Sequence, residues 1–308
     1  MQHQHYGLRS IIALSLLTSP TLGTFFNDAL KAHIDQGVWD AALSTPNATG
    51  TYSMVGFNIS GPFSDTEISG WTISIRVSTN RETHNPEPED SDDDDDDDDD
   101  ENYFTGTSIS VRAPDALLRD NQVILSQDLQ NETTWKVRAY VIDGLKDDVT
   151  EKAQSDDGSC TSFLSQQCIA EWQDYYVKTN GSLSQEPGSC QQDLGRSWGV
   201  WATEDFIPLT AFNNTELFAR AQTGEELDDD GDWYEKAVTD IWPVMMVYYS
   251  VDADNVTRNE QARLTCVRAK NITEGSVQPN AATTLFSAPA SWMTMMGTVG
   301  AAAVFLVL

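Results

Sequence analysis

The residues best suited to sugar chemistry lie in one short stretch, where Trp198 and Trp201 precede the acidic pair Glu204 and Asp205. Glycoside hydrolysis needs two carboxyl groups about 5 to 10 Å apart, and the apolar faces of sugars dock on aromatic rings. On a strand, Trp198 and Trp201 would point to opposite faces, so at most one is expected to be exposed. We interpret these tryptophans as core residues, and keep carbohydrate contact and carboxylate catalysis as alternatives.

Nucleophilic catalysis and metal binding have little support in the sequence. Outside the first 23 residues the only histidines are His33 and His84, neither lies in a triad-like context, and no G-x-S-x-G motif occurs. The acidic cluster 225–232 resembles a calcium-binding loop with Gly231 at position 6, but Ala237 occupies position 12, which requires a bidentate glutamate. We therefore predict a solvated acidic turn there, with no catalytic triad, metal site or cofactor.

The charge of the chain is concentrated in one segment. The 308 residues include 48 acidic and 18 basic side chains, for a formal charge of −30. This excess repels phosphate and excludes nucleic acid as a partner. Between Glu87 and Glu101 lie 13 of the acids, among them nine consecutive aspartates, which favour diffuse cation condensation over a calcium cage. We predict a disordered poly-Asp loop over residues 80–102, at the tip of a hairpin.

The four cysteines predict two disulfides, because their number is even and their spacing matches no zinc motif. They are Cys160, Cys168, Cys190 and Cys266. If residues 162–178 formed one continuous helix, Cys160 and Cys168 would lie about 12 Å apart along it. A bridge between them would then need a break near residues 165–166. All three pairings remain open.

Seven N-x-[ST] sequons predict N-glycosylation, and about three would be expected by chance from the 15 asparagines of the chain. The asparagines are Asn47, Asn58, Asn131, Asn180, Asn213, Asn255 and Asn271. Their spread along the whole chain predicts a heavily glycosylated ectodomain.

Both ends of the chain have the features of processing signals. Residues 1–23 combine Arg9, a seven-residue apolar run and small residues before a cleavage point, which predicts a secretory signal peptide. Residues 292–308 are uncharged and follow a nine-residue spacer after the small triplet 280–282, which predicts attachment of glycosylphosphatidylinositol (GPI) at Asn280. Ser276 is the alternative attachment residue. A C-terminal transmembrane anchor and a buried C-terminal element are the other interpretations of this end.

Strict alternation of apolar and polar residues predicts antiparallel strands over 71–77 and 135–141. Further strands are predicted over 52–59, 103–111, 242–251 and 262–267. The segment 52–59 changes phase between Met54 and Val55, which indicates a β-bulge. Pro243 is acceptable near the start of its strand or on an edge.

Helices are predicted over 25–43 and 162–178. The second carries an apolar stripe formed by Leu164, Cys168, Trp172 and Tyr176, which should pack on a sheet. We therefore predict a mainly β protein, with one antiparallel β-sandwich-like ectodomain over 24–280, one or two packed helices and a disordered acidic hairpin insertion. Residues 281–308 would form the GPI-attachment propeptide.

Several sequence features occur together in a combination that is similar to one class of fungal surface protein. They are the GWTISI strand, the DGSC-x7-C segment before a helix, the strand ending in LTCVRA, the sequons and the small-residue tail. In this combination the chain resembles secreted, GPI-anchored surface glycoproteins of filamentous ascomycete fungi that have no assigned function. The resemblance carries no catalytic residues. The poly-Asp insertion is not part of that pattern.

The leading functional hypothesis is a non-catalytic glycoprotein held on the outer face of the plasma membrane or in the cell wall. Its expected partners are the GPI lipid and cell-wall polysaccharide. A carbohydrate-binding module that uses Trp198 or Trp201 is the first alternative. A carboxylate-dependent, glycoside-active enzyme that uses Glu204 or Asp205 is the second.

Overall fold

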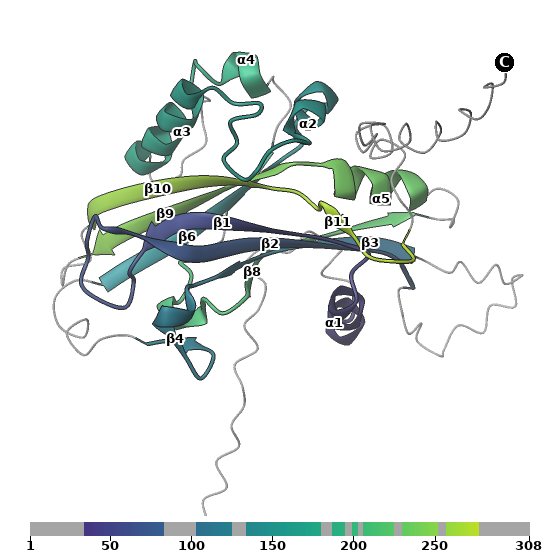
Figure 1. The fold of residues 1–308 in the computed structure, drawn as a ribbon, viewed down its shortest axis with the longest axis horizontal. Helices are drawn as coiled ribbons and strands as arrows, with labels where there is room; N and C mark the ends of the chain where they lie inside the picture. The colour runs from purple at the N-terminus through teal and green to yellow at the C-terminus, as the bar shows by residue number, and fades with distance from the viewer. Residues whose placement is uncertain are drawn as a thin grey trace, which may run out of the picture.

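The computed structural model describes residues 34–82, 103–124, 134–179, 187–194, 199–202, 206–224, 230–251 and 257–276. These residues form two stacked antiparallel sheets with helices on the outer faces (Figure 1). The predicted mainly β, sandwich-like fold is confirmed, although the described ranges contain five α-helices where one or two were predicted. The predicted signal peptide, residues 83–102 of the poly-Asp loop, Asn280 and the propeptide lie outside the described residues.

The five-stranded sheet has the order β11-β1-β2-β3-β8. Its strands are β1 (Ala48–Phe57), β2 (Glu67–Glu82), β3 (Tyr103–Arg112), β8 (Thr215–Gly224) and β11 (Asn271–Ile272). Alternation on β2 is confirmed, because Trp71, Ile73, Ile75 and Val77 are all fully buried. The predicted bulge is confirmed by a register shift between Met54 and Gly56.

The hairpin that carries the poly-Asp segment is longer than predicted. Strand β2 continues to Glu82, because Arg81 and Glu82 still pair with Phe104 and Tyr103 of β3. The connection therefore covers residues 83–102, and its predicted start at residue 80 was wrong. Tyr103 also pairs with Gly224 at the end of β8. Three neighbouring strands thus have their ends side by side at Glu82, Tyr103 and Gly224.

The four-stranded sheet has the order β10-β9-β6-β7. Its strands are β6 (Thr134–Asp143), β7 (Gly199–Ala202), β9 (Trp242–Val251) and β10 (Thr257–Val267). Pro243 is the second residue of β9 and faces Cys266 of β10, which agrees with its predicted place near a strand start. A small hairpin of β4 (Leu118–Arg119) and β5 (Gln122–Val123) and two short 3₁₀ turns, η2 (Asp115–Leu117) and η4 (Leu209–Ala211), complete the β part.

The main core lies between the two sheets and is rich in aromatic side chains. Trp71 meets Phe212 edge to face with ring centres 5.3 Å apart, and Phe57 meets Tyr248 in the same way at 5.0 Å. Such pairs add about 0.5–1.5 kcal/mol each beyond the burial of apolar area. Because these rings come from both sheets, they fix how the sheets stack.

Helix α1 (Gln36–Ser44) covers the outer face of the five-stranded sheet. The carboxylate of Asp35 caps it by accepting hydrogen bonds from the backbone nitrogens of Gly37 at 2.7 Å and Val38 at 3.2 Å. The predicted continuous helix over 25–43 was therefore wrong, because the N-cap at Asp35 starts the helix at residue 36. Trp39 anchors α1 by stacking on Phe104 at 6.0 Å.

Helices α2 (Asp147–Ala153), α3 (Gln166–Thr179) and α4 (Gln191–Leu194) cover the outer face of the four-stranded sheet (Figure 1). The predicted apolar stripe of α3 is buried, which confirms its core role. The helix begins at Gln166, four residues later than predicted, because the Ser165 hydroxyl oxygen accepts a hydrogen bond from the backbone nitrogen of Cys168 at 3.1 Å.

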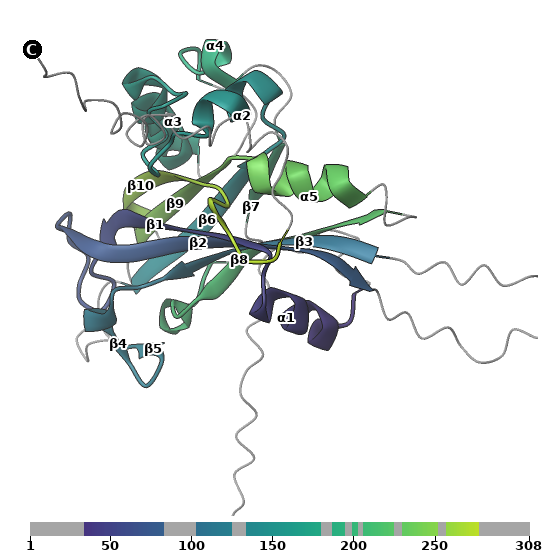
Figure 2. The same ribbon diagram turned by 45° about the vertical axis from the view of Figure 1, so that its right-hand side comes forward.

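Helix α5 (Asp230–Thr239) packs between the sheets at one end of the sandwich. Figure 2 shows α5 above β3, on the opposite side of the strand from α1. Tyr234, Ala237 and Val238 enter the main core from this helix. The predicted acidic turn was wrong for residues 230–232, which form the first turn of α5, while 225–229 lie outside the described residues.

Candidate functional site

Charged side chains from three elements meet where β6, β8 and α5 converge. Asp143 is the last residue of β6 and is 8% exposed. Its side chain lies on the face of the strand that points towards the other sheet, as those of Val141 and Ala139 do. Its Oδ2 atom accepts a hydrogen bond from Nη1 of Arg220, on β8, at 2.9 Å. This ion pair joins the two sheets across the sandwich.

The second half of this charged cluster comes from α5. Lys236 Nζ lies 3.0 Å from Asp240 Oδ1, one helical turn further along the chain. Burial raises the pKa of the Asp240 carboxyl and the negative charge of Asp143 adds to this effect, whereas Lys236 and Arg220 oppose it. We refer to Asp143, Arg220, Lys236 and Asp240 as the charged cluster.

An exposed tryptophan lies next to the charged cluster, on β7. Gly199 faces Asp143 across the β6–β7 pair, and a Cβ atom at Gly199 would lie only 2.5 Å from Asp143 Oδ1. Trp201 pairs with Val141 on the same face and is 38% exposed. Its interpretation as a core residue was therefore wrong, because β7 is the edge strand of its sheet and leaves the ring partly uncovered. Trp198, Glu204 and Asp205 lie outside the described residues.

The arrangement at this edge is better suited to binding than to acid–base catalysis. Each carboxylate of the charged cluster has a cationic partner, so neither is held as a free base within the described residues. An indole face beside a carboxylate and a guanidinium can contact the apolar face and the hydroxyl groups of a sugar. Asp143 could have been suspected from the sequence as the polar end of an alternating strand, but Arg220 and Asp240 carry no comparable signal.

A shallow groove lies along the opposite edge of the sandwich, between β1 and β10. Its volume is about 300 Å³, and it is lined by Ser53, Met54, Val55, Asp157, Gly158, Ser159, Arg263, Leu264 and Thr265. Arg263 extends from β10 to form an ion pair with Glu67 of β2, and its guanidinium lies 4.8 Å from the ring centre of Phe57. The lining offers mainly serine and threonine hydroxyls and one exposed valine. It does not bring together the groups of a recognisable catalytic site.

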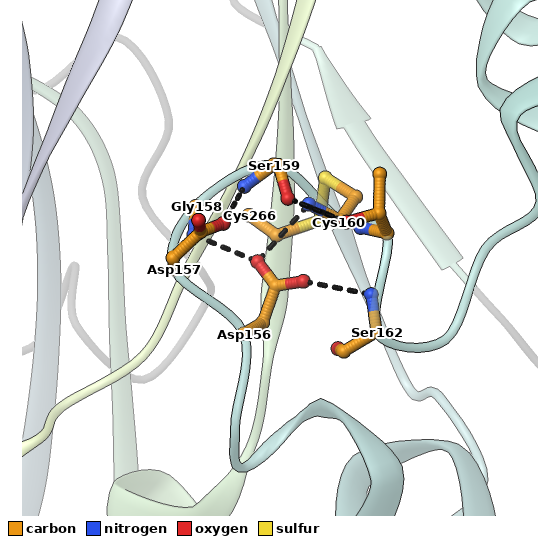
Figure 3. Close-up of a disulfide and its surroundings, with 8 residues drawn as sticks. Asp156, Asp157, Gly158, Ser159, Cys160, Ser162 and Cys266 are labelled. Atoms are coloured by element: carbon orange, nitrogen blue, oxygen red, sulfur yellow. Dashed lines mark hydrogen bonds between the residues drawn. A yellow bond between two sulfur atoms is a disulfide. The ribbon is translucent and has the colours of Figure 1, made fainter.

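A turn built around a buried carboxylate forms one wall of the groove (Figure 3). Asp156 is 6% exposed, and its Oδ1 atom accepts hydrogen bonds from the backbone nitrogens of Gly158 at 2.8 Å and Cys160 at 3.0 Å. Its Oδ2 atom accepts a third from the Ser162 nitrogen at 3.2 Å. Gly158 has φ +111° and would press a Cβ atom to 2.9 Å from Tyr52, so the turn requires glycine there.

The disulfides are Cys160–Cys266 and Cys168–Cys190, with sequence separations of 106 and 22 residues. The first attaches the Asp156 turn to β10, where the Cys266 nitrogen also donates to the Gly158 carbonyl oxygen at 3.0 Å. The second joins α3 to the residue that precedes α4. Two disulfides were predicted correctly, and their pairing, which the sequence left open, is now assigned.

Four of the seven predicted glycosylation sites lie in the described residues. Asn58 and Asn271 are exposed, whereas Asn47 and Asn213 are half-buried. Asn131, Asn180 and Asn255 lie outside the described residues. Exposure therefore differs among sequons that are equivalent in sequence.

Neither a metal cage nor a membrane-spanning helix is found in the part of the chain that the structure describes. No three side chains of His, Cys, Asp or Glu gather there closely enough to hold a metal ion. None of the described helices is both long enough and apolar enough to cross a membrane. Ala237, which occupies position 12 of the calcium-loop comparison, is buried in the main core.

Comparison of the chain with protein-family models, curated proteins and solved structures gives no match. The function is therefore argued from the residues and their geometry.

Proposed function

We propose that the protein is a secreted, N-glycosylated surface protein with a non-catalytic role. In this proposal a GPI lipid attached at Asn280 holds it on the outer face of the plasma membrane or in the cell wall. The observation that carries the proposal is the pair of buried disulfides. All four cysteines of the chain are bridged and none is exposed. Disulfides of this kind form and persist in the oxidising secretory route.

Ser276 contacts the fold, because its hydroxyl oxygen accepts a hydrogen bond from Asn47 Nδ2 at 3.3 Å. Ser276 is the last described residue, four residues before Asn280, so the anchor would lie within about 14 Å of Ser276. The apolar tail, the secretory signal and the sequons support the same proposal, as does the resemblance to fungal surface glycoproteins. The ectodomain would then be held close to the surface that carries it.

Analysis of the mature protein from cells tests this proposal. We expect mass spectrometry to find no peptide from residues 292–308, and a phosphatidylinositol-specific phospholipase to release the protein from the membrane fraction. A matched control is Asn280→Pro together with Ser276→Pro, which removes both attachment residues and should abolish release. Retention of the 292–308 peptide together with resistance to the phospholipase would refute GPI anchoring.

Carbohydrate binding is the second candidate, and the exposure of Trp201 beside the charged cluster favours it. Tryptophans exposed next to paired polar groups supply both the stacking face and the hydrogen bonds that a sugar needs. The expected ligand is a cell-wall polysaccharide presented to the β7 edge.

Binding to insoluble cell-wall polysaccharide tests this second candidate. We expect Trp201→Ala to weaken binding at least tenfold. Val55→Ala is the control, because Val55 is an exposed apolar residue (43%) that lines the groove at the opposite edge of the sandwich. Equal loss in both variants, or no binding by the wild-type protein, would remove the candidate.

A further inference from the structure

We infer that Asn58 carries an N-glycan and that Asn47, although it lies in an intact sequon, stays unmodified because the fold uses its amide. The inference rests on the proposed secretory function and assigns different roles to two sites that the sequence presents as equivalent. Both asparagines flank the same strand, since Asn47 precedes the first residue of β1 and Asn58 follows its last.

The side chain and backbone of Asn47 bind two separate segments, strand β2 and residues 273–276. Its Oδ1 atom accepts hydrogen bonds from the Thr79 nitrogen at 3.0 Å and the Ser78 hydroxyl at 3.3 Å, beside the register shift of β2. Its Nδ2 atom donates to the Ser276 hydroxyl oxygen at 3.3 Å. The backbone nitrogen donates to the Val77 carbonyl oxygen and the carbonyl oxygen accepts from the Thr273 nitrogen, each at 2.8 Å.

These contacts engage the Oδ1 atom, one of the two Nδ2–H groups and both backbone polar groups of Asn47. The amide plane is fixed by bonds on both of its ends, and the bonds hold the C-terminal exit of the described chain against β2. A sugar on Nδ2 would replace one of the two N–H groups of a half-buried amide and would have to fit beside the Ser276 contact while Oδ1 stays bonded to Thr79. Chains modified at Asn47 would therefore lose the contacts that close this corner.

Asn58 has the opposite arrangement. It follows the last residue of β1, its side chain is exposed, and its Oδ1 atom accepts bonds from the Ser60 hydroxyl at 2.6 Å and the Ser60 nitrogen at 3.2 Å. Its Nδ2 atom forms no hydrogen bond within the described part of the chain. The amide nitrogen is therefore free to carry a large group without disturbing the sheet.

The transfer that would modify Asn58 is a simple substitution. The Nδ2 atom forms a bond to the anomeric carbon of a lipid-diphosphate-linked oligosaccharide. The bond between that carbon and the diphosphate oxygen breaks, the lipid diphosphate leaves, and the amide loses one proton. The product keeps one N–H at either site. At Asn58 the new group points from an exposed side chain, whereas at Asn47 it would share a half-buried corner with Ser276.

Two matched variants test the inference, because each removes a sequon hydroxyl and keeps its asparagine. Ser60→Ala should remove one N-glycan from the secreted protein, seen as a loss of one glycan in the intact mass. Thr49→Val should leave the glycan count unchanged. Release by peptide N-glycosidase in heavy-oxygen water should label residue 58 and leave residue 47 unlabelled.

The outcomes separate this inference from the proposed function. Labelling of residue 47, or loss of one glycan in Thr49→Val, would overturn the inference while supporting secretion. An unchanged glycan count in Ser60→Ala would also overturn it. A wild-type protein with no N-glycan at any of the seven asparagines would refute the secretory proposal itself.

A second measurement checks the structural role assigned to Asn47. Asn47→Asp keeps Oδ1 but replaces the donor Nδ2, and Asn58→Asp makes the same change at the exposed site. We expect Asn47→Asp to lower the secreted yield several-fold. We expect Asn58→Asp, which lacks the glycan at residue 58, to be secreted at close to the wild-type yield. Equal yields would contradict the structural role of the Asn47 amide.

Discussion

The two long edges of the sandwich are closed in different ways. At the β1–β10 edge, the Asp156 turn is joined to β10 by the Cys160–Cys266 disulfide and by a backbone hydrogen bond from Cys266 to Gly158. At the opposite edge, formed by β7 and β8 and called the charged edge below, the sheets are joined by the Asp143–Arg220 ion pair, with α5 packed alongside. One closure is covalent and independent of ionic conditions, and the other depends on charge.

The comparison indicates where the molecule can respond to its surroundings. Ion pairs at partly exposed positions weaken with salt and change with pH, whereas a buried disulfide does neither. The exposed Trp201 lies at the charged edge, next to the Asp143–Arg220 ion pair. The β1–β10 edge serves mainly to hold the fold.

The largest expected effect is the loss of the Cys160–Cys266 bridge. This bridge closes a loop of 106 residues, so the double variant Cys160→Ala/Cys266→Ala should lose about 4–5 kcal/mol of unfolding free energy. The shorter Cys168–Cys190 bridge makes the matched control, with an expected loss of about 3 kcal/mol. Urea unfolding of both variants measures the difference, and a larger loss for the shorter loop would contradict the chain-entropy account of this edge.

The next effect concerns the buried carboxylate of the Asp156 turn. Asp156→Ala would leave three backbone N–H groups without their acceptor, and we expect a loss of about 3 kcal/mol in unfolding free energy. Asp157→Ala is the control, because the Asp157 side chain accepts a hydrogen bond only at the exposed Ser159 and should cost much less. Similar losses in the two variants would show that the turn does not depend on its central carboxylate.

At the charged edge, breaking the ion pair should cost less than either change at the covalent edge. Asp143→Ala should lose about 2 kcal/mol, between the values for exposed and buried pairs, since the Asp143 and Arg220 side chains are 10% and 31% exposed. A double-mutant cycle with Arg220→Ala isolates the pairwise energy. A coupling energy near zero would mean that α5 alone closes this edge.

The smallest effect is a pH dependence that arises from Asp240. Because its folded pKa is raised, the folded state binds the proton more tightly than the unfolded state, and charging the group costs stability. This contribution should fall as the pH rises from about 3.9, the ordinary aspartate pKa, through the raised folded value. Asp240→Asn should remove that slope in urea unfolding measured at several pH values. An unchanged slope would show that Lys236 and Arg220 fully offset the burial.

The parts of the fold that were predicted from sequence are those where alternation reports burial directly. On β2, Trp71 to Val77 face the core at every second residue, so period and environment agree. The stripe of α3 and the bulge after Met54 were predictable for the same reason. The two predicted helices begin later in the structure than in the prediction. Each start is set by one capping side chain, Asp35 or Ser165, and the apolar pattern used for the prediction extends beyond that residue.

The charged cluster and strand β8 were missed because their signals are not local. On β8, Phe218 enters the core, whereas Arg220 on the same face meets Asp143 at the end of the sandwich, so the strand lacks a clean alternation. Its partner is 77 residues away in the chain. The pairing of the cysteines depends in the same way on the fold as a whole, which places Cys160 beside β10. Trp201 was judged by its residue type and not by its place on an edge strand.

The paired strand ends at Glu82, Tyr103 and Gly224 bring the attachment points of two strongly acidic segments to one end of the sandwich. The segment with 13 acidic residues leaves and rejoins the sheet there, and the acidic stretch after Gly224 departs beside it. Through Asn47, the exit of the chain at Ser276 is hydrogen-bonded to Ser78 of the same strand. In the proposed GPI-anchored form, a lipid attached beyond Ser276 would tether this same end of the sandwich to the surface that carries the protein. The tether and both acidic segments would then leave the fold at one end, where interactions between fixed charges are screened over about 8 Å at physiological salt.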